Sequence, residues 1–311
     1  MRPWLVRAAV GALAIALGIA VGAGPLQRTN KDRDKQIATQ KADLARKQSH
    51  IEALEAGGAF ADGFAAAVGP SLLRGTLTGQ AVVILTLPGA DPDVVTKLRA
   101  DLGVARARVS GQVDLATAAT SSSGRQLVEA LTSQMLTQSS DVTVPADAGG
   151  YERLGALLAL ALGTGRTGQP PLATYDATAV GIVSGLVSAD LAKASQAVDA
   201  RAGMALVVAG PPARSKAAAA DNAVPVTILR ALGGRMPTVV VGWTGAAGPR
   251  GVIGALRAGT GAPVLSTVDS DETTMGQLAA VLALVARVRS GTVGEFGAVD
   301  ASGGAVPGAA H

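Results

Sequence analysis

Residues 81–115, AVVILTLPGADPDVVTKLRADLGVARARVSGQVDL, contain the stretch that decides the fold. Ala81–Leu87 is a continuous apolar run of strand length, as expected of a strand buried on both faces. Asp91-Pro92 is a typical N-cap and first-turn pair, which predicts a helix over 94–102. Partial alternation over 104–115 predicts a second strand, so the segment is a strand–helix–strand unit.

The same alternation of strands and helices continues through the second half of the chain. Short apolar runs predict strands, and amphipathic or apolar stretches between and around them predict helices. This order is typical of an α/β domain with a mainly parallel, Rossmann-like sheet, expected over 76–299, whereas the Gly/Ala-rich tail 300–311 is predicted to be disordered. The predicted strands are 204–210, 238–242 and 263–269, and the predicted helices are 126–136, 154–162, 224–232, 252–258 and 275–288.

The N-terminal segment, residues 1–27, is predicted to be a membrane anchor. Residues 8–27, AAVGALAIALGIAVGAGPLQ, carry no charge and reach the length of about 20 residues that a membrane-spanning helix needs. A cleaved signal peptide, with Val21-Gly22-Ala23 as the small-residue site, is the alternative. The basic residues after the helix favour a cytoplasmic domain by the positive-inside rule, but long domains cross with little regard to charge. We expect a single-pass protein whose large domain is extracytoplasmic.

Residues 30–56 predict a polar helical stalk. Ile37, Leu44 and Ile51 recur at every seventh residue and Leu54 adds a second core position, while polar residues occupy the other partner positions. The segment is either a solvated helix or a dimerising coiled coil, and we expect a homo-oligomer that forms through it. Gly57-Gly58 is predicted to end the helix.

Composition excludes several classes of function. The chain has no cysteine and only two histidines, which excludes disulfides, thiolate metal sites and a histidine-based metal centre within one chain. Basic residues are scattered and aromatic residues make up 2%, so we expect no nucleic-acid partner. A GxGxxG match at 163–168 follows a predicted helix instead of a strand, and no catalytic motif is present. We therefore expect no enzymatic activity, no catalytic residue and no cofactor.

The most distinctive motif is VDSDETTMGQ, residues 268–277, which follows a predicted strand where open α/β sheets bind ligands. Asp269, Asp271 and Glu272 are its candidate ligands for a hard metal cation. The structural alternative is a helix N-terminus with a capping box formed by Thr274 and Gln277. We favour the structural interpretation and assign no metal site.

These segments together resemble the actinobacterial MctB-like family of copper transporters, also described as copper-transport outer membrane proteins, which includes SteB-like cell-envelope proteins. The late motif departs from that family's pattern, because Glu295-Phe296 replaces an aromatic pair of the GHYG kind and removes a histidine. The matching pieces are AIALGIAVGAG (14–24), VVILTLPGADPDVVTKLRADL (82–102), MALVVAGPP (204–212), STVDSDETTMGQ (266–277) and GTVGEFG (291–297).

The resemblance implies a role in copper efflux or homeostasis at the cell envelope. Copper sites use Cys, Met or His, and here the five methionines are dispersed, so copper rests on the resemblance alone. The alternative function is a non-catalytic septal or envelope scaffold that binds a division or envelope protein through the stalk and the α/β domain.

Overall fold

The computed structural model describes residues 3–139, 144–165, 174–214, 220–259 and 263–308, without the side chains of 3–32 and 34. The chain divides into two compact units, Met1–Phe60 and Ala61–His311. The first is helical, and the second contains the sheet.

Helix α1 (Pro3–Leu73) includes the predicted stalk. The predicted membrane segment, 8–27, is helical in backbone, and its side chains lie outside the described residues. Among the residues whose side chains are described, no helix combines the length and the apolar character needed to cross a membrane. The anchor therefore stays a prediction.

The helix does not end at Gly57-Gly58, as the sequence predicted, but continues to Leu73. Both glycines lie in open space, so each costs only the helix propensity of about 1 kcal/mol. The alanines after them are strong helix formers. The last turns also gain tertiary support within the second unit, because Leu73 is buried and the Asp62 carboxylate accepts a hydrogen bond from the Thr274 backbone N–H at 2.9 Å.

The described residues of the second unit form a seven-stranded sheet in the order β3-β2-β1-β4-β5-β6-β7. Every pairing is parallel except that of β2 with β3. The prediction of an α/β domain with a mainly parallel sheet is confirmed. The strands are β1 (Ala81–Thr86), β2 (Arg108–Leu115), β3 (Ala192–Gln196), β4 (Met204–Val208), β5 (Thr238–Val241), β6 (Ser266–Val268) and β7 (Glu295–Phe296).

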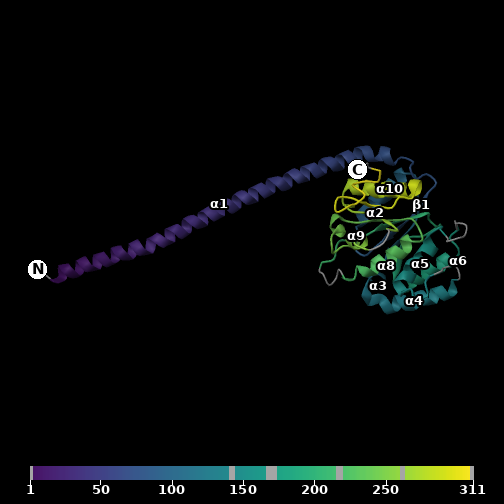
Figure 1. Ribbon diagram of the computed structural model, residues 1–311, viewed down its shortest axis with the longest axis horizontal. Helices are drawn as coiled ribbons and strands as arrows, with labels where there is room; N and C mark the ends of the chain where they lie inside the picture. Colours follow the sequence, from purple (N-terminus) through teal and green to yellow (C-terminus); the bar gives the residue numbers. More distant parts are fainter. Residues whose placement is uncertain (1–2, 140–143, 166–173, 215–219, 260–262, 309–311) are drawn as a thin grey trace. The chain divides into compact units, whose positions relative to one another are not determined.

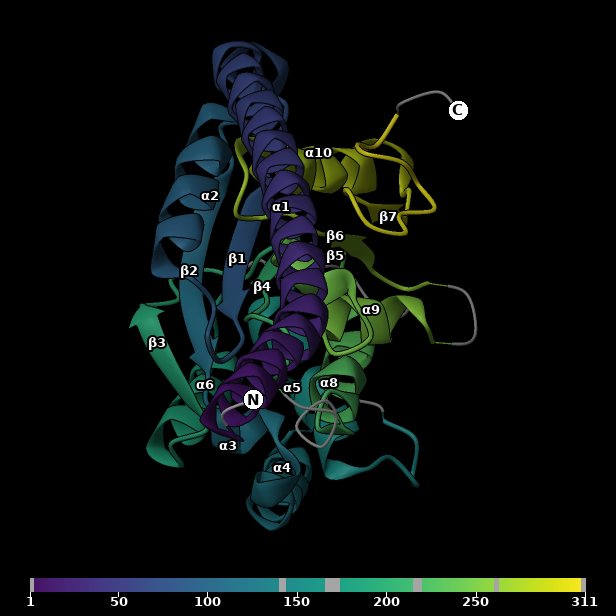
Figure 2. The same ribbon diagram turned by 90° about the vertical axis from the view of Figure 1, so that its left-hand side faces the viewer.

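Helices cover both faces of this sheet (Figures 1 and 2). Because side chains alternate along a strand, Val82 and Ile84 pack in one core with α2 (Pro92–Val104) and α10 (Thr274–Ser290). Val83 and Leu85 pack in the opposite core. That core includes α4 (Arg125–Gln138), α5 (Gly150–Leu162), α6 (Ala177–Ser188), α8 (Ala223–Gly233) and α9 (Val252–Arg257).

The predicted cap of α2 is confirmed, since the Asp91 carboxylate accepts a hydrogen bond from the Asp93 backbone N–H at 2.8 Å. Helix α6, the antiparallel edge strand β3 and the two-residue strand β7 were not predicted from the sequence. Nor were α3 (Thr117–Thr120) and the two 3-10 turns, η1 (Ser122–Gly124) and η2 (Thr244–Ala247).

Residues 300–308 fold back on β7, although the sequence predicted disorder from residue 300. The Gly303 N–H donates to the Glu295 carbonyl at 2.7 Å, and the Gly297 N–H donates to the Gly304 carbonyl at 3.1 Å. Val306 packs against the α2 and α10 core. Glycine permits these turns, and residues 309–311 lie outside the described residues.

Candidate functional site

A cavity of about 390 Å³ lies at the carboxyl ends of the parallel strands. Strands β1 and β4 are neighbours, but the chain leaves β1 toward β2 on one side and β4 toward β5 on the other. Open α/β sheets bind ligands at such a switch point. We call it the edge cavity; its lining residues are Gly89, Asp91, Val94, Ala209, Pro211, Trp243, Asp271 and Glu272.

The loops after β1 and β4 approach each other closely beside this cavity. A Cβ added at Gly210 would meet the Pro88 carbonyl oxygen at 2.2 Å, so only glycine fits there. Gly89 has a φ of +82°, and a Cβ there would meet the Pro211 ring at 3.1 Å. These glycines serve backbone packing, as expected where two loops meet at the switch point.

The loops after β5 and β6 form the other wall. The Thr244 N–H donates to both carboxylate oxygens of Glu272, at 3.1 and 3.3 Å, and the Thr244 hydroxyl donates to the Ser270 hydroxyl at 3.0 Å. Trp243, which follows β5, is 48% exposed. Glu272 is thereby held in place, and a half-exposed indole remains available to a ligand.

Asp271 is the buried acid of the cavity, with an exposed fraction of 5%. Its N–H donates to the Gly242 carbonyl at 3.1 Å, and its own carbonyl accepts from the Gln277 side-chain amide at 2.7 Å. Within the described part of the chain, no group donates a hydrogen bond to its carboxyl. Burial, and then repulsion from Glu272 and Asp91, raises the pKa of Asp271 to about 7.

Asp269 points away from this cavity into a buried ion pair. Its carboxylate lies 3.0 Å from the Arg257 guanidinium, and the two side chains are 0% and 7% exposed. The same carboxylate accepts from the Ser270 hydroxyl and from the backbone N–H groups of Ala298 and Val299, at 2.7, 2.6 and 3.2 Å. Arg257 also donates to the Phe296 carbonyl at 2.7 Å. This pair ties β6 to the segment after β7.

The structure therefore separates the three predicted metal candidates: Asp271 and Glu272 line the edge cavity, and Asp269 does not. Across the described ranges, no group of three or more His, Cys, Asp or Glu side chains could hold a metal ion. Asp91 and Trp243 were not predicted from the sequence as neighbours of these acids, because they follow different strands.

The predicted capping box is wrong by one residue. Thr273 is the N-cap of α10, and its hydroxyl accepts from the Gly276 N–H at 3.0 Å. Gln277 does not complete a box, because its side chain bonds the Asp271 carbonyl and so fixes the loop that carries Asp271. The glycine match at 163–168 begins where α5 ends, and 166–168 lie outside the described residues.

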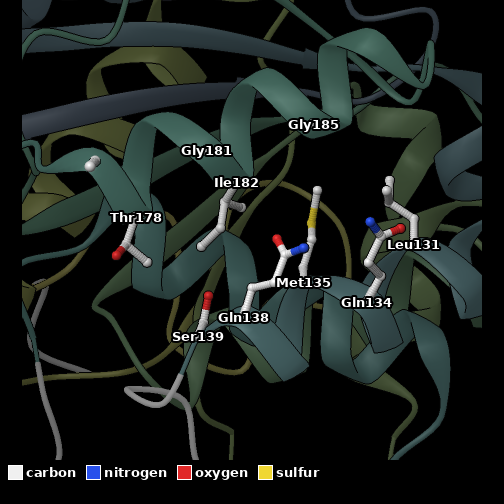
Figure 3. A pocket seen from close by; sticks show the side chains of 10 residues that line it. Leu131, Gln134, Met135, Gln138, Ser139, Thr178, Gly181, Ile182 and Gly185 are labelled. Atoms are coloured by element: carbon white, nitrogen blue, oxygen red, sulfur yellow. The ribbon is translucent and has the colours of Figure 1, made fainter.

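A second cavity of about 380 Å³ lies between α4 and α6 (Figure 3). Met135 extends between the two helices toward Gly185, where an added Cβ would meet the Met135 methyl carbon at 2.4 Å. Among its described lining residues, Met135 supplies the single sulfur, and no imidazole or carboxylate accompanies it. A copper ion would need more soft donors than this cavity offers.

A family model described as "Copper transport outer membrane protein, MctB" matches residues 4–307, nearly the whole chain. No curated protein matches the chain.

Proposed function

The chain belongs to the MctB family, and from this premise we propose that it is a membrane-anchored, non-catalytic cell-envelope protein that acts in copper efflux or homeostasis. The observation that carries the proposal is the family match over residues 4–307. In this proposal residues 8–27 form the single membrane-spanning helix and the α/β unit is extracytoplasmic.

We propose that copper is a cargo that passes between protein molecules, and that no copper-binding site lies within a single α/β unit. Of the described methionines, Met135, Met204 and Met236 are at most 7% exposed, and Met275 is 42% exposed. Cysteine is absent from the chain, and His50 lies on a solvent-exposed stretch of α1. Among the described residues, soft donors are thus too few and too dispersed to form a copper site within one chain.

A titration of the full-length protein in detergent micelles tests the copper role. Cu(I) competition against a coloured chelator should show no tight site in the monomer, while cells that lack the protein should lose copper tolerance. Unchanged copper tolerance of the strain that lacks the protein would refute the copper role.

A reporter fusion tests the proposed topology. A phosphatase fused at the C-terminus should be active, and an inactive, cytoplasmic fusion would refute the topology.

The absence of catalysis is part of the proposal. Among the described residues, Asp271 combines burial in a cavity with a raised pKa, as is typical of a general acid. Among the residues that the structure describes, the lining of the edge cavity contains carboxylates and an indole, but no hydroxyl, thiol, amine or imidazole nucleophile. If a strain with Asp271→Asn lost copper tolerance while the protein stayed folded, this result would show that catalysis or ligand binding at this cavity is required for the function.

A second candidate function is a scaffold that self-associates through α1. Ile37, Leu44, Ile51 and Leu54, which we call the apolar stripe, are between 47% and 65% exposed. Apolar side chains at heptad spacing on a solvated helix favour a coiled-coil partner. We propose a second copy of the chain as that partner, since the apolar stripes of both copies are then buried against each other.

The residues that flank the apolar stripe form no like-charged pair in two parallel copies, whereas Lys47, at a core position, would face Lys47 of the other copy. In a parallel coil the residue before each first core position faces the residue five positions later on the other helix. No like-charged pair results among the stalk positions concerned. The facing pairs are Gln36 with Lys41, Asp43 with Gln48, and His50 with Glu55.

Sedimentation of the full-length protein with Leu44→Ser and Ile51→Ser tests this scaffold. We expect a shift toward monomer, with an unchanged mass for a control that carries Ala42→Ser and Ala53→Ser on the opposite face of the helix. A wild-type protein that is already monomeric would refute self-association.

A further inference from the structure

The edge cavity combines features that identify the chemistry of its ligand. Its volume of about 390 Å³ lies within the ~300–1,000 Å³ of small-molecule sites. Its lining includes the acids Asp91, Asp271 and Glu272 and, among the described residues, no lysine or arginine. An acidic cavity without a compensating base favours a cation.

The acids do not converge on one point. No three acidic, histidine or cysteine side chains in the described chain are grouped closely enough for a metal ion. A molecular cation, which is larger than a metal ion and spreads its charge over several atoms, can instead reach separated carboxylates. Val94, Ala209 and Pro211 supply the apolar part of the lining that such a body would contact.

Asp271 and Trp243 supply the specific contacts. The Asp271 residue is only 5% exposed, and no described group donates a hydrogen bond to its carboxyl, so the carboxylate remains available as an acceptor for a ligand N–H. The half-exposed indole of Trp243 offers the best ring face for a cation.

We propose that the edge cavity binds a small organic cation, whose ammonium or amidinium N–H donates to the Asp271 carboxylate and whose charge lies against the Trp243 ring. This inference goes beyond the proposed copper function and does not depend on it, because it rests on cavity residues alone.

Binding is linked to a proton. The charged groups that face Asp271 are Glu272 on its own loop and Asp91 from the loop after β1; α10 contributes the neutral Gln277. Because the pKa of Asp271 is raised to about 7, its carboxyl is neutral at pH 5.5 and charged at pH 8. The cation needs the carboxylate, so its affinity rises with pH and levels off above about pH 8.

Calorimetric titration of the full-length protein with benzamidine tests the proposal. Benzamide is the matched neutral probe, because it has the same ring and a similar shape. At pH 8 we expect benzamidine to bind at least tenfold more tightly than benzamide, and roughly thirtyfold more weakly at pH 5.5 than at pH 8. Equal binding of the two probes, or no saturable binding of benzamidine, would overturn the proposal.

Substitutions locate the binding. Asp271→Asn and Trp243→Leu should each weaken benzamidine binding several-fold or more, whereas Asp199→Asn, in an exposed ion pair elsewhere, should leave it unchanged. Asp91→Asn is a further variant that keeps the cap of α2, because asparagine caps as well as aspartate, and it should also weaken binding. Thermal unfolding verifies that each variant folds, and full affinity in folded Asp271→Asn and Asp91→Asn variants would sink the proposal.

Discussion

Asp269 and Asp271 lie two residues apart and have opposite environments. Ser270 between them has a φ of +72°, in the left-handed region that few side chains other than Asn and Asp adopt readily. That turn directs Asp269 to the Arg257 guanidinium and leaves Asp271 facing the edge cavity. The same residue type is therefore structural at one position and available to a ligand at the other.

Removal of the buried Asp269 carboxylate should destabilise the fold strongly. Asp269→Ala leaves Arg257 buried at 7% exposure without its ion-pair partner, at an expected cost of about 3–5 kcal/mol in the free energy of unfolding. Asp199→Ala is the matched control, because Asp199 and Arg108 are both 59% exposed and such pairs contribute about 0–1 kcal/mol. Urea unfolding measures both variants. If the two substitutions lowered the free energy of unfolding equally, the structural role of Asp269 would be contradicted.

Asp271 makes stability depend on pH in the opposite direction to an ion-paired acid. Its pKa is raised from 3.8 to about 7, so between these values the folded protein binds a proton that the unfolded chain has released. This contribution to stability is present in full below about pH 4 and declines as the pH rises to about 7. Asp271→Asn should remove that decline.

The variant is therefore expected to exceed the wild type in stability at pH 8, by roughly 2–4 kcal/mol, and to match it near pH 4. Chemical denaturation at the two pH values measures the difference. A constant difference between the proteins at both pH values would show that Asp271 ionises normally.

Single residues of the site were visible in the sequence, but their partners were not. Asp269, Asp271 and Glu272 stood out because they follow a predicted strand end. Nothing local marked Arg257 as the partner of Asp269, or Asp91 as a neighbour of Asp271, because these residues meet only when the strands are ordered. Thr273 and Thr274 both suit a cap, and tertiary contacts of Thr274 and Gln277 decided between them.

At the scale of elements, the packing of α5 against α8 depends on one glycine. A Cβ at Gly155 would meet the Ile228 carbonyl oxygen at 2.3 Å and the Ala231 methyl at 2.7 Å. Gly155→Ala should thus force the helices apart and cost about 2 kcal/mol or more, despite the better helix propensity of alanine. Gly181→Ala is the control, since nothing lies within 4 Å of that Cβ on α6, and a gain of about 0.5–1 kcal/mol is expected.

Thermal or urea unfolding of the two variants distinguishes these signs. If Gly155→Ala stabilised the protein as much as Gly181→Ala, the close approach of α5 and α8 would be wrong.

Buried elements were predictable and edge elements were not. β1, β4 and β5 are continuous apolar runs, because both faces of a central parallel strand are covered. β3, with the sequence AKASQ, has no such run, and its antiparallel pairing with β2 at the sheet edge tolerates exposed polar residues. Helix α6 was not predicted because Gly181, Gly185 and its β-branched residues lower its helix propensity. In α1, the alanines that follow Gly57-Gly58 and the packing of the last turns outweighed the low helix propensity of the two glycines.

At the scale of the whole molecule, membership of the MctB family and the apolar stripe constrain how copies would associate. Chains anchored by their N-termini in one membrane would present α1 in the same direction. Only a parallel coil would then bury the stripe in register, with Ile37 facing Ile37 and Ile51 facing Ile51 of a second copy. An antiparallel coil would instead place Ile37 opposite the region of Leu54.

A cysteine introduced at position 37 separates these arrangements. The chain has no natural cysteine, so Ile37→Cys carries the sole thiol. In a parallel coil the two introduced thiols face each other at core positions, where Cα atoms come within the roughly 4.4–6.8 Å that a disulfide spans. Mild oxidation should produce a covalent dimer of the full-length Ile37→Cys protein on a non-reducing gel.

The matched variant is Ala42→Cys, on the opposite face of α1, which should remain mostly monomeric under the same oxidation because its thiols point away from the partner helix. An antiparallel coil would leave Ile37→Cys unlinked as well, yet a mixture of Ile37→Cys and Leu54→Cys proteins would then form the covalent dimer. Cross-linking of position 37 to itself, and not to position 54, is the outcome expected if tethering and the heptad pattern act together.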